Sequence, residues 1–221
     1  TSGTFNMYNG TISGNCAQSG GGVEVYRNGS FTMEGGEIRK NQAENKSYGN
    51  GGGVAVQMGS FAMKSGTISG NTAKKNGGGV YVDQYSFTME GGTITNNTAN
   101  AAGGGVYMYN GSFTMSGGSI TGNKAVSNGK GVYIEGIASC QLSGGARIAE
   151  NTGSGTGNLY VMMGRELSIT NLTTGAQLGI CFSRPGDMLV ATGDKQSLNY
   201  LTCENDGYVF TLQNSNELWL K

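Results

Sequence analysis

Histidine is absent from the 221 residues, and proline occurs once, at Pro185. Without histidine, and with four cysteines that lack CxxC spacing, the chain does not meet the common zinc-site patterns. A single proline excludes a collagen-like chain, which needs abundant proline and glycine at every third position. Charged residues make up only 13% and balance to a formal net charge of zero, so no basic footprint for nucleic acid exists.

Long apolar runs are also missing. No stretch of 18 apolar residues occurs, so no transmembrane helix is expected. Glycine, at 42 of 221 residues, disfavours long helices because it destabilises a helix interior by about 1 kcal/mol relative to alanine. No signal peptide is visible, and the chain begins at Thr1 within a repeat. We therefore expect a mature or excised segment of a longer chain with flanking domains.

An internal repeat dominates the sequence. The phrase GGGVYVDQYSFTMEGGTITNNT at 77–98 recurs as GGGVYMYNGSFTMSGGSITGN at 103–123, an offset of 26 residues. Weaker copies surround GGGVEV and GGGVAV, and degraded copies surround GKGVYI and GNLYV. A fixed period of this kind is the signature of a repeat architecture.

Each copy contributes one residue to each of several columns. The columns are Val23, Val54, Val80, Val106, Val132 and Leu159; Phe5, Phe31, Phe61, Phe87, Phe113 and Cys140; Met7, Met33, Met63, Met89, Met115 and Leu142; Ile12, Ile38, Ile68, Ile94, Ile120 and Ile148; and Asn15, Asn41, Asn71, Asn97, Asn123 and Asn151. We expect all of them to point inward, with the asparagines inside a bend where their amides bond along the stack. The glycine pairs, such as Gly91–Gly92, are expected to supply positive φ at bends.

Apolar and polar residues alternate at period two within each copy, as in V-Y-V, F-T-M and T-I-T. This alternation is typical of half-buried strands. Three such strands per period predict one turn of a three-sided coil, whereas a propeller blade needs about 40 residues or more. The sequence therefore predicts an all-β fold, a right-handed single-stranded parallel β-helix with three short strands and about 26 residues per turn.

The pattern changes near residue 152, where the SFTM phrase is lost. We divide the chain into β-helix repeats at 1–151 and, at 152–221, degraded last turns followed by a C-terminal β cap. A cap is expected because the end of a solenoid exposes apolar surface and open strand edges. Cys140 replaces a phenylalanine and is expected to be a buried thiol, and pairing of Cys181 with Cys203 stays open.

The repeat resembles known families. The pattern I-x-x-N-x-A followed by G-G-G-V-Y, as in ITNNTANAAGGGVY, resembles the repeat of chlamydial polymorphic membrane proteins, which pair FxxN with GGAI. The whole phrase and the tail GNLYVMMGRELSITNLTTGAQLGI resemble β-helix segments in large surface proteins of gut Firmicutes. The resemblance covers essentially the whole chain and implies an adhesin-like segment, secreted or attached to the bacterial surface.

Candidate catalytic groups are sparse. Polysaccharide lyases and hydrolases with this fold need clustered carboxylates, but the only aspartates are Asp83, Asp187, Asp194 and Asp206. Asp83 and Glu135 occupy one column two turns apart, roughly 10 Å by strand spacing. Glu34 and Glu90 flank Lys64 in another column, which indicates a surface charge ladder. We therefore expect no catalytic residues, no metal site and no cofactor.

Two outward stripes are candidate binding faces. The first is a speculative ligand-binding face that consists of Tyr81, Tyr107, Tyr133 and Tyr160, whose rings could bind sugars or a protein. Tyrosine also suits strands and can stack on itself, so a structural role is the alternative. The second stripe, Thr-x-Thr pairs such as Thr93 and Thr95, is similar to ice-binding solenoids, but Glu37 and Arg39 interrupt it.

We expect a non-enzymatic structural and binding module of a bacterial secreted or cell-surface protein, an adhesin-like stalk or passenger segment. Its expected partner is a host or microbial glycan or surface protein, with no role for nucleic acid and no membrane-spanning segment. One alternative is a polysaccharide-active β-helix enzyme or its catalytically dead remnant. Another is a spacer without any ligand.

Overall fold

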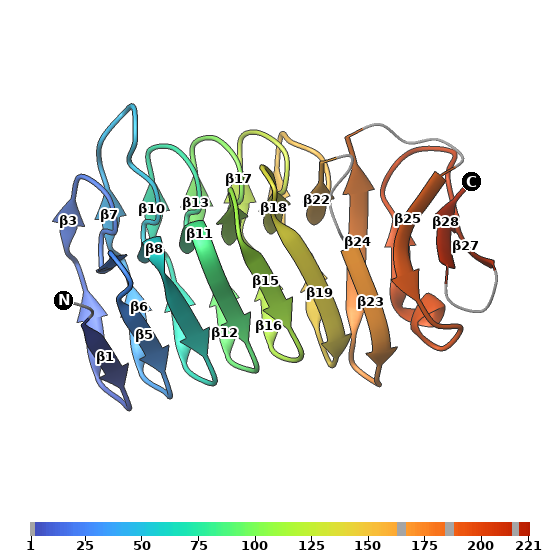
Figure 1. The fold of residues 1–221 in the computed structure, drawn as a ribbon. Helices are drawn as coiled ribbons and strands as arrows, with labels where there is room; N and C mark the ends of the chain where they lie inside the picture. The colour runs from blue at the N-terminus through green and yellow to red at the C-terminus, as the bar shows by residue number, and fades with distance from the viewer. Residues whose placement is uncertain (1–2, 163–166, 184–187, 214–216) are drawn as a thin grey trace.

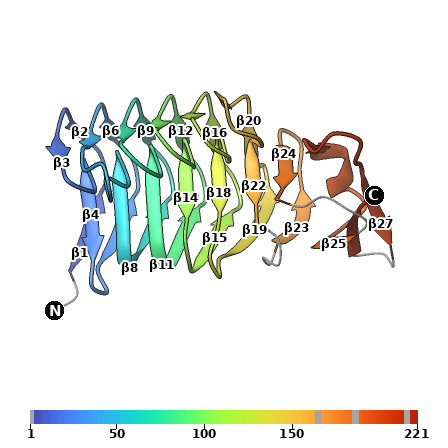
Figure 2. The same cartoon turned by 90° about the horizontal axis from the view of Figure 1, so that it is seen from above.

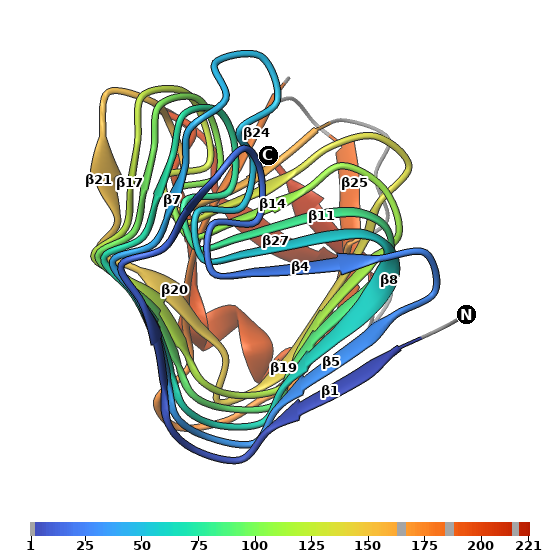
Figure 3. The same cartoon turned by 90° about the vertical axis from the view of Figure 1, so that its left-hand side faces the viewer.

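The protein is a rod of stacked coils. A computed structural model describes residues 3–162, 167–183, 188–213 and 217–221. Over these residues the chain winds about seven turns of about 26 residues each, from the N-terminal coil to the C-terminal coil (Figure 1). Seen along the rod, successive coils superpose on a three-sided outline (Figure 3). The predicted parallel β-helix is confirmed.

Two faces of the coil consist of the V-x-V and F-x-M strands. The V-x-V face holds β4 (Val23–Tyr26), the start of β8 (Val54–Met63), the start of β11 (Val80–Met89), β14 (Val106–Met108), β18 (Val132–Ile134), β22 (Leu159–Val161) and the end of β24 (Gln177–Phe182). The F-x-M face holds β1 (Thr4–Met7), β5 (Ser30–Met33), the ends of β8 and β11, β15 (Ser112–Met115), β19 (Ser139–Gly144), β23 (Leu167–Leu172) and β25 (Met188–Gly193). In β8 and β11 one continuous strand therefore serves both faces.

The third face follows the isoleucine column, and a short strand after it completes each coil. The third face holds β2 (Thr11–Ser13), β6 (Glu37–Arg39), β9 (Thr67–Ser69), β12 (Thr93–Thr95), β16 (Ser119–Thr121), β20 (Arg147–Ala149), the start of β24 and β26 (Leu201–Cys203). The short strands are β3 (Cys16–Ala17), β7 (Gln42–Ala43), β10 (Thr72–Ala73), β13 (Thr98–Ala99), β17 (Lys124–Ala125) and β21 (Thr152–Gly153). These two-residue strands form a ladder of their own, which adds a fourth element to the three predicted per turn.

Like residues pair with like residues in parallel register, as in Phe61 with Phe87 and Ile68 with Ile94. Each repeat therefore places its inward columns directly over those of the next. The phenylalanine rings stack almost parallel, with centroids 4.8 Å apart for Phe31–Phe61 and for Phe61–Phe87. The predicted valine, phenylalanine, methionine and isoleucine columns are buried in this core, except at the N-terminal coil, where Phe5 is 43% exposed.

The asparagine column is a continuous hydrogen-bond ladder. The N–H and Nδ2 of Asn71 both donate to Oδ1 of Asn97, each at 2.9 Å, and Asn97 donates in the same way to Asn123. The remaining Nδ2 proton goes to an isoleucine carbonyl of the preceding coil, for example from Asn97 to Ile68 at 2.9 Å. The donations from one side chain of the column to the next all run toward the C-terminal end, through Asn123 and Asn151 to Asn158, so Asn158 needs an acceptor beyond it. Glu204 supplies it, because its carboxylate accepts from both the N–H and the Nδ2 of Asn158.

The two glycines of each GG pair are required for different reasons. The second glycine has positive φ, 82° at Gly92 and 83° at Gly118, as predicted. The first glycine lies against the preceding coil, and a Cβ at Gly91 would approach the carbonyl oxygen of Lys64 to 2.6 Å. Any side chain there would push the coils apart.

Parallel pairing continues beyond the regular repeats and then changes direction. Ile180 of β24 pairs with Leu159 and with Cys203, and β23 pairs with β25. A 3-10 helix, η1 (Ser197–Tyr200), precedes β26, and β28 (Glu217–Leu220) pairs antiparallel with both β25 and β27 (Phe210–Gln213). Figure 2 shows these last elements at one end of the rod. Whether 1–151 and 152–221 act as separate units stays a prediction.

In the part of the chain that the structure describes, no helix is long and apolar enough to cross a membrane.

Candidate functional site

The four tyrosines of the predicted binding face lie one above another on the outer side of the V-x-V face. Tyr81 pairs with Tyr107, which pairs with Tyr133, which in turn pairs with Tyr160. Their rings stack with centroids 5.6, 5.2 and 5.2 Å apart and interplanar angles of at most 17°. The tyrosines therefore point away from the core, as their alternation with Val80 and Val82 predicts.

These tyrosines form a covered stack rather than an open platform, and their role in binding a ligand stays a prediction. Tyr81, Tyr107 and Tyr160 are only 9%, 6% and 8% exposed, and Tyr133 is half-buried. The ring faces contact one another, and Ala102, from the loop before β14, packs in one cluster with Tyr81 and Tyr107. A Cβ at Gly103, for example, would lie 2.7 Å from the Cβ of Tyr107. This covering reflects the path of the loops, which period-two alternation does not encode.

An open depression lies beside the start of the tyrosine stack, and we call it the tyrosine groove. Its volume is about 360 Å³. It is lined by Asn50, Lys75, Asn76, Tyr81, Tyr107, Tyr109 and Glu135. Loops and strands of four successive coils supply these residues, and Asn50, Lys75 and Asn76 were not predicted. The repeated N-G-G-G at 50–53 and 76–79 is the signal in the sequence that marks Asn50 and Asn76.

Hydrogen bonds fix several walls of the tyrosine groove. The hydroxyl of Tyr107 donates to the carboxylate of Glu135. Oδ1 of Asn50 accepts from the N–H of Asn76 at 3.1 Å, and Oδ1 of Asn76 accepts from the N–H of Ala102 at 3.2 Å. The amide oxygens of Asn50 and Asn76 therefore connect neighbouring loops. The phenols of the tyrosines and the carboxylate of Glu135 form another part of the lining.

The environment of the tyrosines keeps their hydroxyls protonated. Burial, and then the charge of Asp83, the Tyr109 phenol and Glu135, raises the pKa of Tyr81 far above its ordinary value. Burial also raises the pKa values of Tyr133 and Tyr160. These phenols are hydrogen-bond donors at every physiological pH.

Asp83, Tyr109 and Glu135 occupy the same position in three consecutive coils, with Tyr109 in the middle. The N–H of Tyr109 donates to the carbonyl of Val82 at 2.9 Å, and that of Glu135 donates to Met108 at 2.8 Å, so the three residues belong to consecutive coils. Asp83 accepts from Nδ2 of Asn110 at 3.3 Å. The column thus brings two carboxylates to one outer surface, roughly 10 Å apart by strand spacing.

The other charged columns are surface pairs. Lys64 contacts Glu34 at 2.8 Å, which agrees with the predicted charge ladder, and Arg39 contacts Glu37 at 3.0 Å on the threonine stripe. Asp187 lies outside the described residues. Within the described ranges, no group of three or more His, Cys, Asp or Glu side chains could hold a metal ion.

The cysteines are free thiols in this structure. Cys181 stands beside Tyr160 on the outer side, whereas Cys203 stands beside Ile180 on the core side, so the two thiols face opposite sides of adjacent strands. Cys140 continues the phenylalanine column below Phe113 and is fully buried, as predicted.

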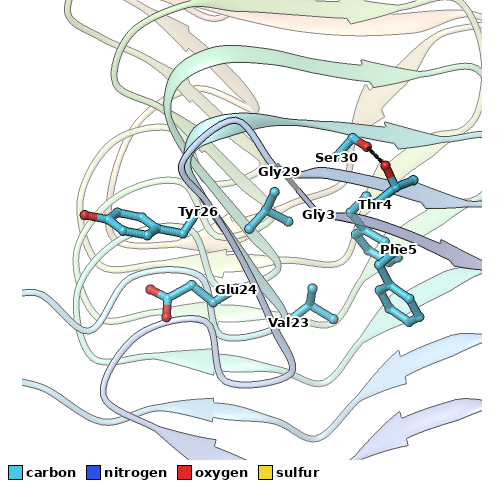
Figure 4. Close-up of a pocket in the computed structure, with 10 residues that line it drawn as sticks. Gly3, Thr4, Phe5, Val23, Glu24, Tyr26, Gly29 and Ser30 are labelled. Atoms are coloured by element: carbon cyan, nitrogen blue, oxygen red, sulfur yellow. Dashed lines mark hydrogen bonds between the residues drawn. The ribbon is translucent and has the colours of Figure 1, made fainter. Parts of the chain in front are cut away.

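Two further cavities lie at the ends of the rod. One, of about 270 Å³, opens at the first coil, and its lining includes Phe5, Val23 and Ser30 (Figure 4). Glu24 and Tyr26 extend from its other side, and the hydroxyl of Ser30 lies 3.1 Å from that of Thr4. The second is lined by apolar residues of the C-terminal elements, such as Leu198 and Phe210. Both are openings of the coil interior; the ionisable residues that line them are Glu24 and Tyr26 in the first and Cys203 and Tyr208 in the second.

Residues 1–152, more than half of the chain, match the family model for a right handed beta helix region. The chain therefore belongs to the right-handed β-helix family. Comparison with curated proteins and with solved structures gave no match. Because this family includes enzymes and non-enzymes, membership fixes the fold and leaves the activity open.

Proposed function

We propose that the chain is a non-enzymatic structural and binding module that takes a glycan in the tyrosine groove. The observation that carries this proposal is the convergence of phenols, amides and a carboxylate from four successive coils on one open depression. In the larger context we place it as an adhesin-like stalk or passenger segment of a bacterial secreted or cell-surface protein. The resemblance of its repeat to surface proteins supports that context.

The lining of the groove suits a sugar. Protonated phenols and a carboxylate offer donors and acceptors to ring hydroxyls, and Tyr109, 43% exposed, offers an aromatic face. The stacked tyrosines below it make a rigid floor, because their ring faces already contact one another. A preformed floor lowers the entropic cost of binding an extended ligand.

The test is a glycan array with the wild-type chain, followed by titration of each hit. Tyr109→Ala should weaken binding at least about tenfold, since an exposed ring can be removed without opening a core cavity. Tyr8→Ala, which removes a 73% exposed ring on another face, is the matched control. If wild type binds no glycan, or if both variants bind as wild type does, the proposal fails.

A polysaccharide-active enzyme is the second candidate, and the shared column of Asp83 and Glu135 favours it. Two carboxylates at this spacing fit an inverting hydrolysis better than a retaining one. Incubating the wild-type chain with each glycan hit and measuring new reducing ends or unsaturated products separates the candidates. Turnover that Glu135→Gln abolishes would establish the enzyme, whereas binding without turnover supports the module. Absence of binding to any glycan or surface protein would favour a spacer.

A further inference from the structure

Three exposed tyrosines lie where the V-x-V face turns into the F-x-M face, and we call these three residues the aromatic corner. They are Tyr26, Tyr85 and Tyr109, which are 48%, 54% and 43% exposed, and each follows the V-x-V residues of its own coil. Tyr109 also lines the tyrosine groove. Aromatic side chains therefore continue from the groove along this edge of the rod toward the N-terminal coil.

The Tyr85 side chain is held along the rod rather than across it. Its hydroxyl donates to Oδ1 of Asn28 at 3.0 Å, and Asn28 lies two coils nearer the N-terminus. The partner of Tyr85 in the preceding coil is Gly59. In the following coil the same position is Gly111, where a Cβ would collide with the carbonyl oxygen of Tyr85. Because both neighbours lack a side chain, neither covers the Tyr85 ring.

Tyrosine is an unfavourable residue at this position of the backbone. Gln84 and Tyr85 have φ values of 68° and 71°, a left-handed conformation that residues with a Cβ rarely adopt. Gly111 has a φ of 93° at the same position of the next coil, and glycine adopts such values without this penalty. Strain of this kind is typical of functional sites. The backbone alone would favour glycine here, so the ring itself is the feature that needs a role.

We infer that the glycan of the proposed function is an extended polysaccharide, which leaves the tyrosine groove at Tyr109 and packs along the Tyr85 ring toward Asn28. This inference rests on the proposed function and adds the length and the direction of the sugar chain. The C–H face of a sugar ring packs against an aromatic face, while its hydroxyls bond to amides such as that of the exposed Gln84. The path from Tyr109 to Asn28 spans three coils, about 14 Å by strand spacing.

The length of the sugar chain tests this inference. Isothermal titration calorimetry compares dimers with hexamers of β-1,4-linked glucose, N-acetylglucosamine and xylose, and of any other linear glycan found on the array. A dimer can occupy the groove but is too short to span the three coils as well. We expect at least one hexamer to bind about tenfold more tightly than its own dimer. If both lengths bind equally in every series, the inference is wrong.

Variants assign the gain of the hexamer to the Tyr85 ring. Tyr85→Ala should weaken hexamer binding about fivefold or more and leave dimer binding unchanged. Tyr85→Gly, which relieves the positive φ, should have the same effect, and this excludes backbone strain as the cause. Tyr48→Ala is the matched control, because Tyr48 is also exposed and its hydroxyl donates to Oε1 of Gln18 in the neighbouring coil at 2.7 Å. This control should bind both lengths as wild type does.

The outcomes separate this inference from the proposed function. A hexamer gain that both Tyr85 variants keep overturns the extended path and leaves glycan binding in the groove standing. If the array yields only short or branched glycans and no hexamer binds, the inference alone is wrong. If no glycan binds at all, both proposals are wrong. Circular dichroism spectra check that every variant retains the coil.

Discussion

Phe87 is a residue-level test of the register, because it lies between two stacked rings. It is fully buried, with ring centroids 4.8 Å from Phe61 and 5.3 Å from Phe113. Phe87→Ala should lower the free energy of unfolding by about 3–5 kcal/mol, since the neighbouring coils hold the cavity open. Phe5→Ala, at the exposed end of the same stack, should cost less than about 1.5 kcal/mol. Equal losses in urea denaturation would contradict the interior position of Phe87.

Single residues also show how far the sequence could predict this molecule. The alternation of apolar and polar residues predicts which side chains point inward. Phe87, Ile94 and Cys140 were therefore placed correctly in the core. Period two also placed Tyr107 on the outer side, but it carries no information about the loops that cover this ring. The groove brings Lys75 and Glu135, from loops of different coils, into the lining of one depression, and no local pattern predicts this.

In the asparagine ladder each side chain takes part in several hydrogen bonds, so removing one asparagine should lower the free energy of unfolding by more than the loss of one bond. Asn97→Ala removes the acceptor of the N–H and of one Nδ2 proton of Asn71. It also removes the Nδ2 donor of the buried Ile68 carbonyl, whereas Oδ1 of Asn123 keeps the backbone N–H of residue 97. Each orphaned group costs about 1–3 kcal/mol, so the free energy of unfolding should fall by at least about 3 kcal/mol.

The matched control for the ladder is Asn100→Ala, three residues along the same coil and exposed. It should change the free energy of unfolding by less than about 0.5 kcal/mol. Guanidinium denaturation of the two variants measures the difference. A small loss for Asn97→Ala would show that water or relaxed backbone replaces the ladder bonds.

The tyrosine stack gives the second element-level prediction, which concerns alkaline pH. Burial raises the pKa values of Tyr81, Tyr133 and Tyr160 above that of an unfolded tyrosine, which is about 10. The unfolded chain therefore loses these protons first. The stabilisation is complete below pH about 10 and declines as pH rises toward the folded pKa values.

Tyrosinate absorbance checks this prediction directly. At pH about 11, the native chain should show an incomplete absorbance change that urea completes. Tyr81→Phe removes one buried phenol and should reduce the loss of stability between pH about 10 and 12. Full ionisation of the native chain at pH about 11, without unfolding, would mean that the stack is open to solvent.

At the scale of the whole molecule, the two ends of the rod should respond differently to acid. The interior ladders of the regular coils consist of asparagine, phenylalanine, methionine and isoleucine, which do not titrate. Near the C-terminal end, by contrast, Asp194 holds two elements together. Its carboxylate accepts from the N–H of Asn171 in β23 at 2.7 Å and from the N–H and hydroxyl of Ser197 in η1 at 2.9 and 2.8 Å.

These contacts make the C-terminal coils the acid-sensitive part of the rod. Burial alone would raise the pKa of Asp194, but the hydrogen bonds from Ser197, Asn171 and Gln196 outweigh it and lower the pKa. The stabilisation is therefore present above the unfolded pKa of about 3.9 and is lost as pH falls through the lower folded value. Trp219 in β28 is the single tryptophan and reports on this end, while far-UV circular dichroism reports on all coils. On acid titration the Trp219 fluorescence should change before the dichroism does. Asp194→Asn should remove most of this early change, so coincident transitions in both proteins would contradict a local clamp.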